Sequence, residues 1–348
     1  MTKLLSYSGI VTKVRAMDAT LLKPSQYQEI INLNSTTDLV SYLRQQPAYA
    51  YAFASLDDHL IHRGDIEKIL IESLYHDYMK LYRFADPALQ QFLLLYMKRY
   101  EVDLINYCFR IVFNHYDEPF DLANKSPFFD KYSQISIAKL ITSRTIEELV
   151  DNLKDTSYFE PLNRLRQTHA STLFDYNLAL DLYYYSSIWK EKNKTLKGQS
   201  LEIFTKYHGV KIDFLNLQWI YRAKKYYHMT STDIYSLLIP IHYKIRTPML
   251  RALVESASID EFNVLLYQTY YCKKYNTAEK MSLEAIYSDY LYRLFRTDSK
   301  NNPYSITTIN NYLFLKEEEI RKITTALECI RYKLGPSDIS RYVGGVAQ

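Results

Sequence analysis

The chain has 348 residues, of which 47% are hydrophobic and 24% are charged, and a formal net charge of +4. This balance is ordinary for a soluble protein of two or three domains, and the charge is too small to indicate binding to nucleic acid or to an anionic membrane surface. The chain contains only 7 glycines, where about 7% of residues would be usual. Extensive β-hairpins and a glycine-rich phosphate-binding loop are therefore not expected.

Cysteine usage and hydropathy narrow the class of protein further. The three cysteines, Cys108, Cys272 and Cys329, are scattered and include no C-x-x-C pair. We therefore expect neither a disulfide framework nor a zinc site, and we expect a reducing compartment. No apolar stretch approaches the roughly 18 residues needed to span a bilayer, so we expect membrane association only through a partner protein.

Hydrophobic residues recur at helical spacing along most of the chain. In chain order we expect long or medium helices over residues 6–19, 65–84, 88–113, 172–190, 201–227, 249–256, 259–274, 283–296 and 312–334. Shorter helices are expected to begin at Pro24 and at the capping residue Ser35. The Gly335-Pro336 pair is expected to end the last long helix. Almost no strand alternation is present, which predicts an all-α protein.

One segment recurs three times, and we call it the acid–leucine segment. In each copy an acidic residue precedes Leu39, Leu149 or Phe262, a leucine follows four positions later, and a tyrosine closes the segment nine or ten positions later. The copies are 110 and 113 residues apart. This period is too long for a solenoid and indicates repeated subdomains, so we predict three similar helical bundles.

A second pattern, of acidic and amide residues, recurs in the same order. Its members and the basic residues near them are Asp103, Asn106, Arg110, Asp213, Asn216, Arg222 and Lys224. The two Asp-x-x-Asn elements are 110 residues apart and each adjoins an apolar stripe. In a third, degenerate copy Glu319 takes the place of the aspartate and Lys322 the place of the asparagine.

The repeated acids can be interpreted in two ways. Catalysis would need convergent acids with separated pKa values. A structural role needs only that a half-buried carboxylate find a donor such as Arg110, Arg222 or Lys224. Repetition favours the structural role, because an active site is rarely needed once per bundle. Since nucleotide-binding and hydrolase motifs are also missing, we predict no catalytic, metal-binding or cofactor-binding residues and no enzyme activity.

Two further candidates have ordinary explanations. His59 and His62 are close enough on a helix to share a metal, with Asp57, Asp58 and Asp65 nearby, but a solvated helix end explains them better. The run from Trp219 to His228 interleaves aromatic and basic residues. It fits nucleic-acid binding, a protein-contact surface, or core aromatics whose basic neighbours extend to solvent.

The order and spacing of several motifs resemble one known family. The motifs that carry the resemblance are Tyr7, Val14-Arg15-Ala16-Met17, Leu21-Leu22, Tyr27, residues 39–43, residues 99–106, residues 213–217 with Arg222-Ala223-Lys224, Tyr312, Lys316 and Glu319-Ile320. Together they are similar to the C subunit of V/A-type rotary ATPases, the relative of the eukaryotic V-ATPase d subunit. Lys322 in place of an asparagine departs from the pattern.

The resemblance implies a three-lobed, all-helical, funnel-shaped protein with pseudo-threefold symmetry. It implies a non-catalytic central-stalk subunit that links the central shaft (D and F type subunits) to the membrane rotor ring (c/K type). The implied location is the cytoplasmic side of the membrane, reached only through the ring, with no cofactor and no nucleic-acid partner. The alternative function is a helical nucleic-acid-binding protein that uses the Trp219–His228 run.

Lobe boundaries follow from the repeats and the connectors. We expect a first lobe over residues 1–128, a second over 129–243 and a third over 244–348. Residues 1–20 are placed so that they could pack with the C-terminal lobe instead.

Overall fold

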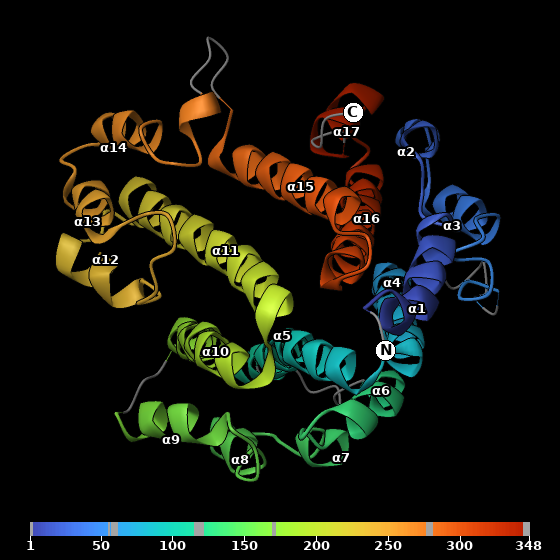
Figure 1. The fold of residues 1–348 in the computed structure, drawn as a ribbon, viewed down its shortest axis with the longest axis horizontal. Coiled ribbons are helices and arrows are strands. Elements are labelled where there is room, and N and C mark those ends of the chain that lie inside the picture. Colours follow the sequence, from blue (N-terminus) through green and yellow to red (C-terminus); the bar gives the residue numbers. More distant parts are fainter. Residues whose placement is uncertain are drawn as a thin grey trace. The chain divides into compact units, whose positions relative to one another are not determined.

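The structure is a computed structural model that describes residues 3–54, 56, 62–114, 122–168, 172–275 and 281–343. Within these residues every regular element is a helix (Figure 1), which confirms the all-α prediction. The chain divides into two compact units, one formed by Met1–Leu89 with Ser282–Gln348 and the other by Gln90–Met281.

The first unit is built around one long helix, α16. Its helices are α1 (Lys3–Asp18), α2 (Pro24–Ile31), α3 (Thr36–Arg44), α4 (Arg63–Phe84), α15 (Leu283–Asn301), α16 (Ile306–Arg331) and α17 (Pro336–Val343). The central α16 packs against α1, α3, α4, α15 and α17, and α1 also packs against α4 (Figure 1). Buried residues of α16 such as Ile309, Leu313, Ile320 and Ile323 recur at intervals of three, four or seven, as the buried face of a helix requires.

The second unit is built around α11 and α10. Its elements are α5 (Pro87–Phe113, which begins in the first unit), η1 (Ala123–Lys125), α6 (Ser126–Tyr132), α7 (Ile137–Leu140), α8 (Ile146–Asp151), α9 (Phe159–Gln167), α10 (Leu173–Thr195), α11 (Gly198–Lys225), α12 (Ser231–Leu237), α13 (Thr247–Glu255), α14 (Ile259–Leu266) and η2 (Lys273–Tyr275). Helix α11 packs against α10, α12 and α14. Aromatic rings join α5 to both long helices, with ring centroids 6.2 Å apart for Phe92 and Phe204 and 4.7 Å apart for Phe109 and Tyr176.

The acid–leucine segment forms the same element in all three places. The helices α3, α8 and α14 each begin after an N-cap hydroxyl that accepts the backbone N–H three residues later, from Ser35, Thr145 and Ser258 respectively. Leu39, Leu149 and Phe262 are each fully buried. The repeat therefore reflects a shared local structure as well as a shared spacing.

Helix boundaries differ from the sequence expectation at the C-terminal end of the chain. Helix α16 begins at Ile306 rather than residue 312, because Ser305 caps it by accepting the N–H of Thr307. It ends at Arg331, four residues before the expected Gly335-Pro336 pair, and Lys333 (φ 54°) takes the left-handed conformation that often follows a helix end. Pro336 then occupies the first turn of α17, where proline is favourable, and does not end α16.

Candidate functional site

Three buried carboxylates tie long helices to loops, and we call each one with its donors a carboxylate anchor. The third anchor, on α11, is the most completely bonded. Asp213 is 2% exposed. It accepts hydrogen bonds from the backbone N–H groups of Tyr243, Lys244 and Ile245 at 3.1, 2.6 and 3.1 Å and from the hydroxyl of Tyr271 at 2.7 Å. Its charge is therefore shared among four donors, none of which is a basic side chain of the described residues.

The second anchor lies on α5 and uses Glu101. This carboxylate accepts hydrogen bonds from the hydroxyl of Tyr158 at 2.7 Å and from the hydroxyl of Ser133. The Ser133 hydroxyl in turn accepts the N–H of Ile135 at 3.0 Å. Burial and the neighbouring Glu101 raise the pKa of Tyr158 well above its usual value, so the phenol stays protonated and donates.

The first anchor lies in the first unit and includes a buried cation. Glu319 on α16 accepts hydrogen bonds from the hydroxyl of Tyr49 at 2.6 Å and from the N–H of Leu22. Lys316, one turn before Glu319, donates to the Tyr49 hydroxyl at 2.8 Å and lies 3.3 Å from the carboxylate. The Lys316 and Glu319 side chains are 1% and 2% exposed. Burial and Glu319 raise the pKa of Tyr49 well above its usual value.

The anchors share one register along the chain. Each tyrosine is the residue that closes an acid–leucine segment, and it lies 57 residues after the carboxylate in the second anchor and 58 after it in the third. In the first anchor the carboxylate lies near the other end of the chain, 270 residues after the tyrosine. Each carboxylate also accepts a hydrogen bond from a loop residue that precedes the tyrosine by a similar distance. These residues are Leu22, Ser133 and Lys244, which lie 27, 25 and 27 residues before the tyrosines of the first, second and third anchors. In the second and third anchors the closing tyrosine therefore bonds to the long helix that precedes its segment in the chain, α5 or α11. In the first anchor it bonds to α16, near the C-terminal end of the chain.

The structure distributes the repeat-motif residues over several environments. Asp213 and Glu319 are anchors, whereas the equivalent acid of α5 is Glu101, two residues before Asp103. The Asp103 side chain is 51% exposed and pairs with Arg99 at 3.0 Å. Arg110 is exposed, and the buried amide oxygen of Asn106 accepts no hydrogen bond from the described residues.

Two other predicted residues of α11 close nearby loops. Asn216 exchanges two hydrogen bonds with the backbone of Ile239, at 3.0 and 2.9 Å. Lys224 donates to the carbonyl of Ser256 at 2.7 Å. The expectation that Arg222 or Lys224 supplies the donor for the repeated acid is wrong for Asp213, whose donors are backbone N–H groups and a tyrosine. Sequence reasoning missed the role of these tyrosines, although their repeated position closing the segment was a usable signal.

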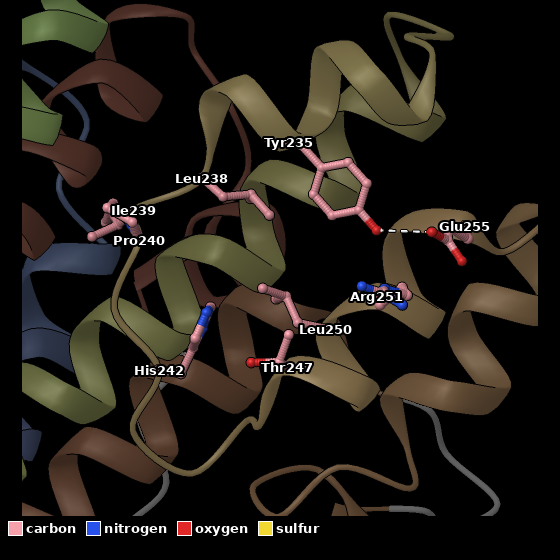
Figure 2. A pocket seen from close by; sticks show the side chains of 9 residues that line it. All are labelled: Tyr235, Leu238, Ile239, Pro240, His242, Thr247, Leu250, Arg251 and Glu255. Atoms are coloured by element: carbon pink, nitrogen blue, oxygen red, sulfur yellow. Dashed lines mark hydrogen bonds between the residues drawn. The ribbon is translucent and has the colours of Figure 1, made fainter.

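Two hollows in the second unit lie beside α12. One, of about 630 Å³, is lined by Phe174, Asn177, Leu178, Asp181, Trp219, Arg222, Ala223, Tyr227, Met229 and Leu237. The other, of about 340 Å³, lies between α12 and α13 (Figure 2). There the Tyr235 hydroxyl donates to Glu255 at 3.1 Å, with Arg251 beside them and apolar residues such as Leu238 and Leu250 facing the space.

No group of three His, Cys, Asp or Glu residues that could hold a metal occurs among the described residues. Of the histidine pair His59 and His62, His59 lies outside the described residues, as do Asp57 and Asp58.

Over the described part of the chain, no helix is both long enough and apolar enough to cross a membrane.

Gly209 allows the loop of the third anchor to approach α11. A Cβ atom added at this residue would lie 2.4 Å from Cγ of Tyr243, whose N–H donates to Asp213. We expect Gly209→Ala to lower the free energy of unfolding by about 1–3 kcal/mol, despite the better helix propensity of alanine. In urea denaturation the matched control Gly9→Ala, where no atom lies within 4 Å of the added Cβ, should be neutral or stabilising. Equal effects of the two changes would contradict the close approach.

His208 makes folding of the second unit sensitive to acid. Its ring is buried against Phe204, with ring centroids 3.8 Å apart, and burial, helped by Lys211, lowers its pKa to about 3. Because the unfolded chain binds a proton near pH 6.5 while the folded chain does not, stability falls as the pH falls below that value, by about 2 kcal/mol at pH 5. The loss between pH 7 and pH 5 should shrink by this amount in His208→Gln. It should not change in His242→Gln, at an exposed histidine; identical pH profiles of the two variants would count against the burial argument.

Comparisons with known proteins match nearly the whole chain. Residues 10–342 match the family of the ATP synthase (C/AC39) subunit. The C subunit of the A-type ATP synthase of Methanosarcina acetivorans is 24% identical over 330 residues, 91% of this chain and 87% of that protein. The corresponding protein of Pyrococcus horikoshii is also 24% identical, over 98% of this chain and 91% of that protein. That of Methanocaldococcus jannaschii is 23% identical, over 96% and 85%.

The matched range includes all three anchors, from Leu22 in the first to Glu319 in the same anchor near the other end. The resemblance drawn from the scattered motifs is thereby confirmed. The chain belongs to the ATP synthase (C/AC39) subunit family, a family of non-catalytic subunits of a rotary ATPase.

Proposed function

We propose that this chain is a central-stalk subunit of a V/A-type rotary ATPase and acts as a socket between the central shaft and the membrane rotor ring. Its partners are then shaft subunits of the D and F types and ring subunits of the c/K type. It sits on the cytoplasmic side of the membrane, held there by the ring alone. The observation that carries the proposal is the family match over residues 10–342, supported by A-type ATP synthase relatives of nearly equal length.

The three carboxylate anchors are consistent with this role. A coupling subunit must resist shear between its partners. This task requires rigid lobes and does not require a reaction centre. Each anchor fixes a loop and an acid–leucine segment to a long helix through buried, charge-assisted hydrogen bonds. We infer that the three anchors mark three similar lobes around a pseudo-threefold axis, which together form the funnel. The lobe boundaries at residues 128 and 243 stay a prediction.

The coupling role predicts different outcomes for two activities of one complex. A complex reconstituted without this chain should retain ATP hydrolysis by its catalytic sector and lose ATP-driven ion transport, because torque no longer reaches the ring. Transport into vesicles and phosphate release are measured on the same preparation. Adding back the purified chain should restore transport, and transport that persists without it would refute the socket.

Direct binding gives a second test. The purified chain should retain D and F type shaft subunits of the same organism in a pull-down, and separately the detergent-solubilised ring. Binding to neither, under conditions in which a related protein of the family binds both, would overturn the proposal. The nucleic-acid alternative has weaker support, because Lys224 of the basic run is engaged with the Ser256 carbonyl. Detectable binding to RNA or DNA at low salt that is lost in Arg222→Ala and Lys225→Ala would revive it.

A further inference from the structure

The first unit is assembled from two segments that lie far apart in the sequence. Residues 1–89 supply α1 to α4, and residues 282–348 supply α15 to α17. The two segments pack on each other, because α16 contacts α1, α3 and α4 and because α17 contacts α2 (Figure 1). Much of the core of the first unit therefore forms only when the two segments meet.

The first anchor joins these two segments through buried polar groups. Glu319 and Lys316 of the second segment bind the hydroxyl of Tyr49 of the first at 2.6 and 2.8 Å. Because these groups are buried, separating the segments would leave the Lys316 and Glu319 charges without the hydroxyl that they share. Two further pairs join the same segments, Asp77 with Tyr312 and Arg63 with Glu328.

The second unit is one continuous stretch of chain. Its two anchors join residues only 57 and 58 positions apart, Glu101 with Tyr158 and Asp213 with Tyr271. Both pairs lie within residues 90–281, which also connect the two segments of the first unit. Whenever the first unit is closed, the second unit is therefore a loop of roughly 190 residues whose ends are held.

This connectivity makes the opening of the two units unequal. When the first unit opens, its two segments become free tails, and no ring closure opposes the gain in chain entropy. When the second unit opens within a closed first unit, its unfolded chain must still begin and end at fixed points. For a loop of roughly 190 residues, the dependence of ring closure on the −3/2 power of length lowers that opening equilibrium on the order of a thousandfold.

We propose that the first unit is an independently opening element of this chain, which opens while the second unit stays folded and which the first anchor holds closed. Opening separates α16 from α1, α3 and α4. For units of equal intrinsic stability, the reverse state, with only the second unit unfolded, is rarer by the ring-closure factor. By reciprocity, a folded second unit favours closure of the first by the same factor. The inference does not depend on the socket, because it concerns the folding equilibria of the isolated chain.

Native-state hydrogen exchange of the full chain measures both openings. In sub-denaturing urea the amides of α16 should exchange faster than those of α11. Glu319→Gln should speed exchange in α16 at least about tenfold, whereas the matched control Glu318→Gln, at the pair with the half-exposed Arg321, should not. Asp213→Ala should speed exchange in α11 and leave α16 unchanged. Faster exchange in α11 than in α16 of the unmodified chain, or equal acceleration of both helices by each variant, would overturn the inference.

Joining the ends of the chain separates connectivity from intrinsic stability. With a flexible linker of about 20 residues between residues 348 and 1, the opened first unit is itself a closed loop. Exchange in α16 should then slow at least about tenfold, while exchange in α11 stays unchanged because its loop was already closed. The matched control is the linear chain that carries the same linker at one end. Equal exchange of α16 in the cyclic and linear forms would contradict the ring-closure argument.

Discussion

Asp213→Ala is expected to lower the free energy of unfolding of the second unit by about 3–5 kcal/mol. The change removes the common acceptor of three backbone N–H groups and one tyrosine hydroxyl. A buried N–H left without an acceptor, such as that of Ile245, costs about 1–3 kcal/mol, and the part-buried N–H groups of Tyr243 and Lys244 cost less because water can reach them. The effect should therefore exceed that of a typical buried hydrogen bond several-fold.

Hydrogen exchange gives the sharpest measurement for this variant. The amides of Tyr243, Lys244 and Ile245 should lose protection, because the loop opens locally before the unit unfolds. The matched control is Asp103→Ala, which removes the acid that the 110-residue spacing equates with Asp213. Since Asp103 is half exposed and pairs with Arg99, its loss should cost less than about 1 kcal/mol. Similar losses for the two variants would contradict the assignment of the anchor to Asp213 and Glu101.

The sequence predicted the elements of the fold better than the contacts between them. The all-α class and the repeated acid–leucine segment follow from signals that act within a few residues. These signals are the spacing of apolar residues and the capping hydroxyls of Ser35, Thr145 and Ser258. The pairing of Glu319 with Tyr49 could not be read in this way, because it joins residues 270 positions apart. The offset of 110 aligned Asp103 with Asp213, whereas the buried acid that matches Asp213 is Glu101. Two residues along a helix turn the side chain by about 200°, which places Glu101 on the buried face and Asp103 on the exposed one. Burial and the bond from Tyr158 distinguish Glu101 from Asp103, and both appear only in the folded chain.

The hollow of about 630 Å³ beside α12 shows the same limit of sequence reasoning. The Trp219–His228 run was visible as a mixture of aromatic and basic residues, but three uses of it remained open. Phe174, which also lines this hollow, lies 45 positions before Trp219 on another helix, and its exposure is a property of the fold alone. The sequence could therefore identify the aromatic and basic residues of one helix, but not the hollow that they form with a second helix.

Glu319→Ala is expected to lower the free energy of unfolding of the first unit by about 3–5 kcal/mol, because it leaves the buried Lys316 charge without its counter-ion. Lys316, which is 1% exposed, would keep only the Tyr49 hydroxyl as a hydrogen-bond acceptor among the described residues, and the N–H of Leu22 would lose its acceptor. Urea denaturation and hydrogen exchange at Leu22 measure the loss. Glu318→Ala is the matched control one residue away, because Glu318 pairs with the half-exposed Arg321 and should cost less than about 1 kcal/mol.

A double-mutant cycle tests whether the unpaired charge of Lys316 causes this loss of stability. Removing both charges in Lys316→Met with Glu319→Gln leaves an uncharged acceptor for Tyr49 and Leu22, and a buried ion pair is often replaceable by neutral groups at little cost. The double variant should therefore be at least about 2 kcal/mol more stable than Glu319→Gln alone. If adding Lys316→Met lowers stability further, the cation supports the helix through packing over the Tyr49 ring, whose centroid lies 4.0 Å from Nζ, and not through the pair. The second and third anchors have no lysine side chain among the described donors to their carboxylates, so this coupling should be confined to the first.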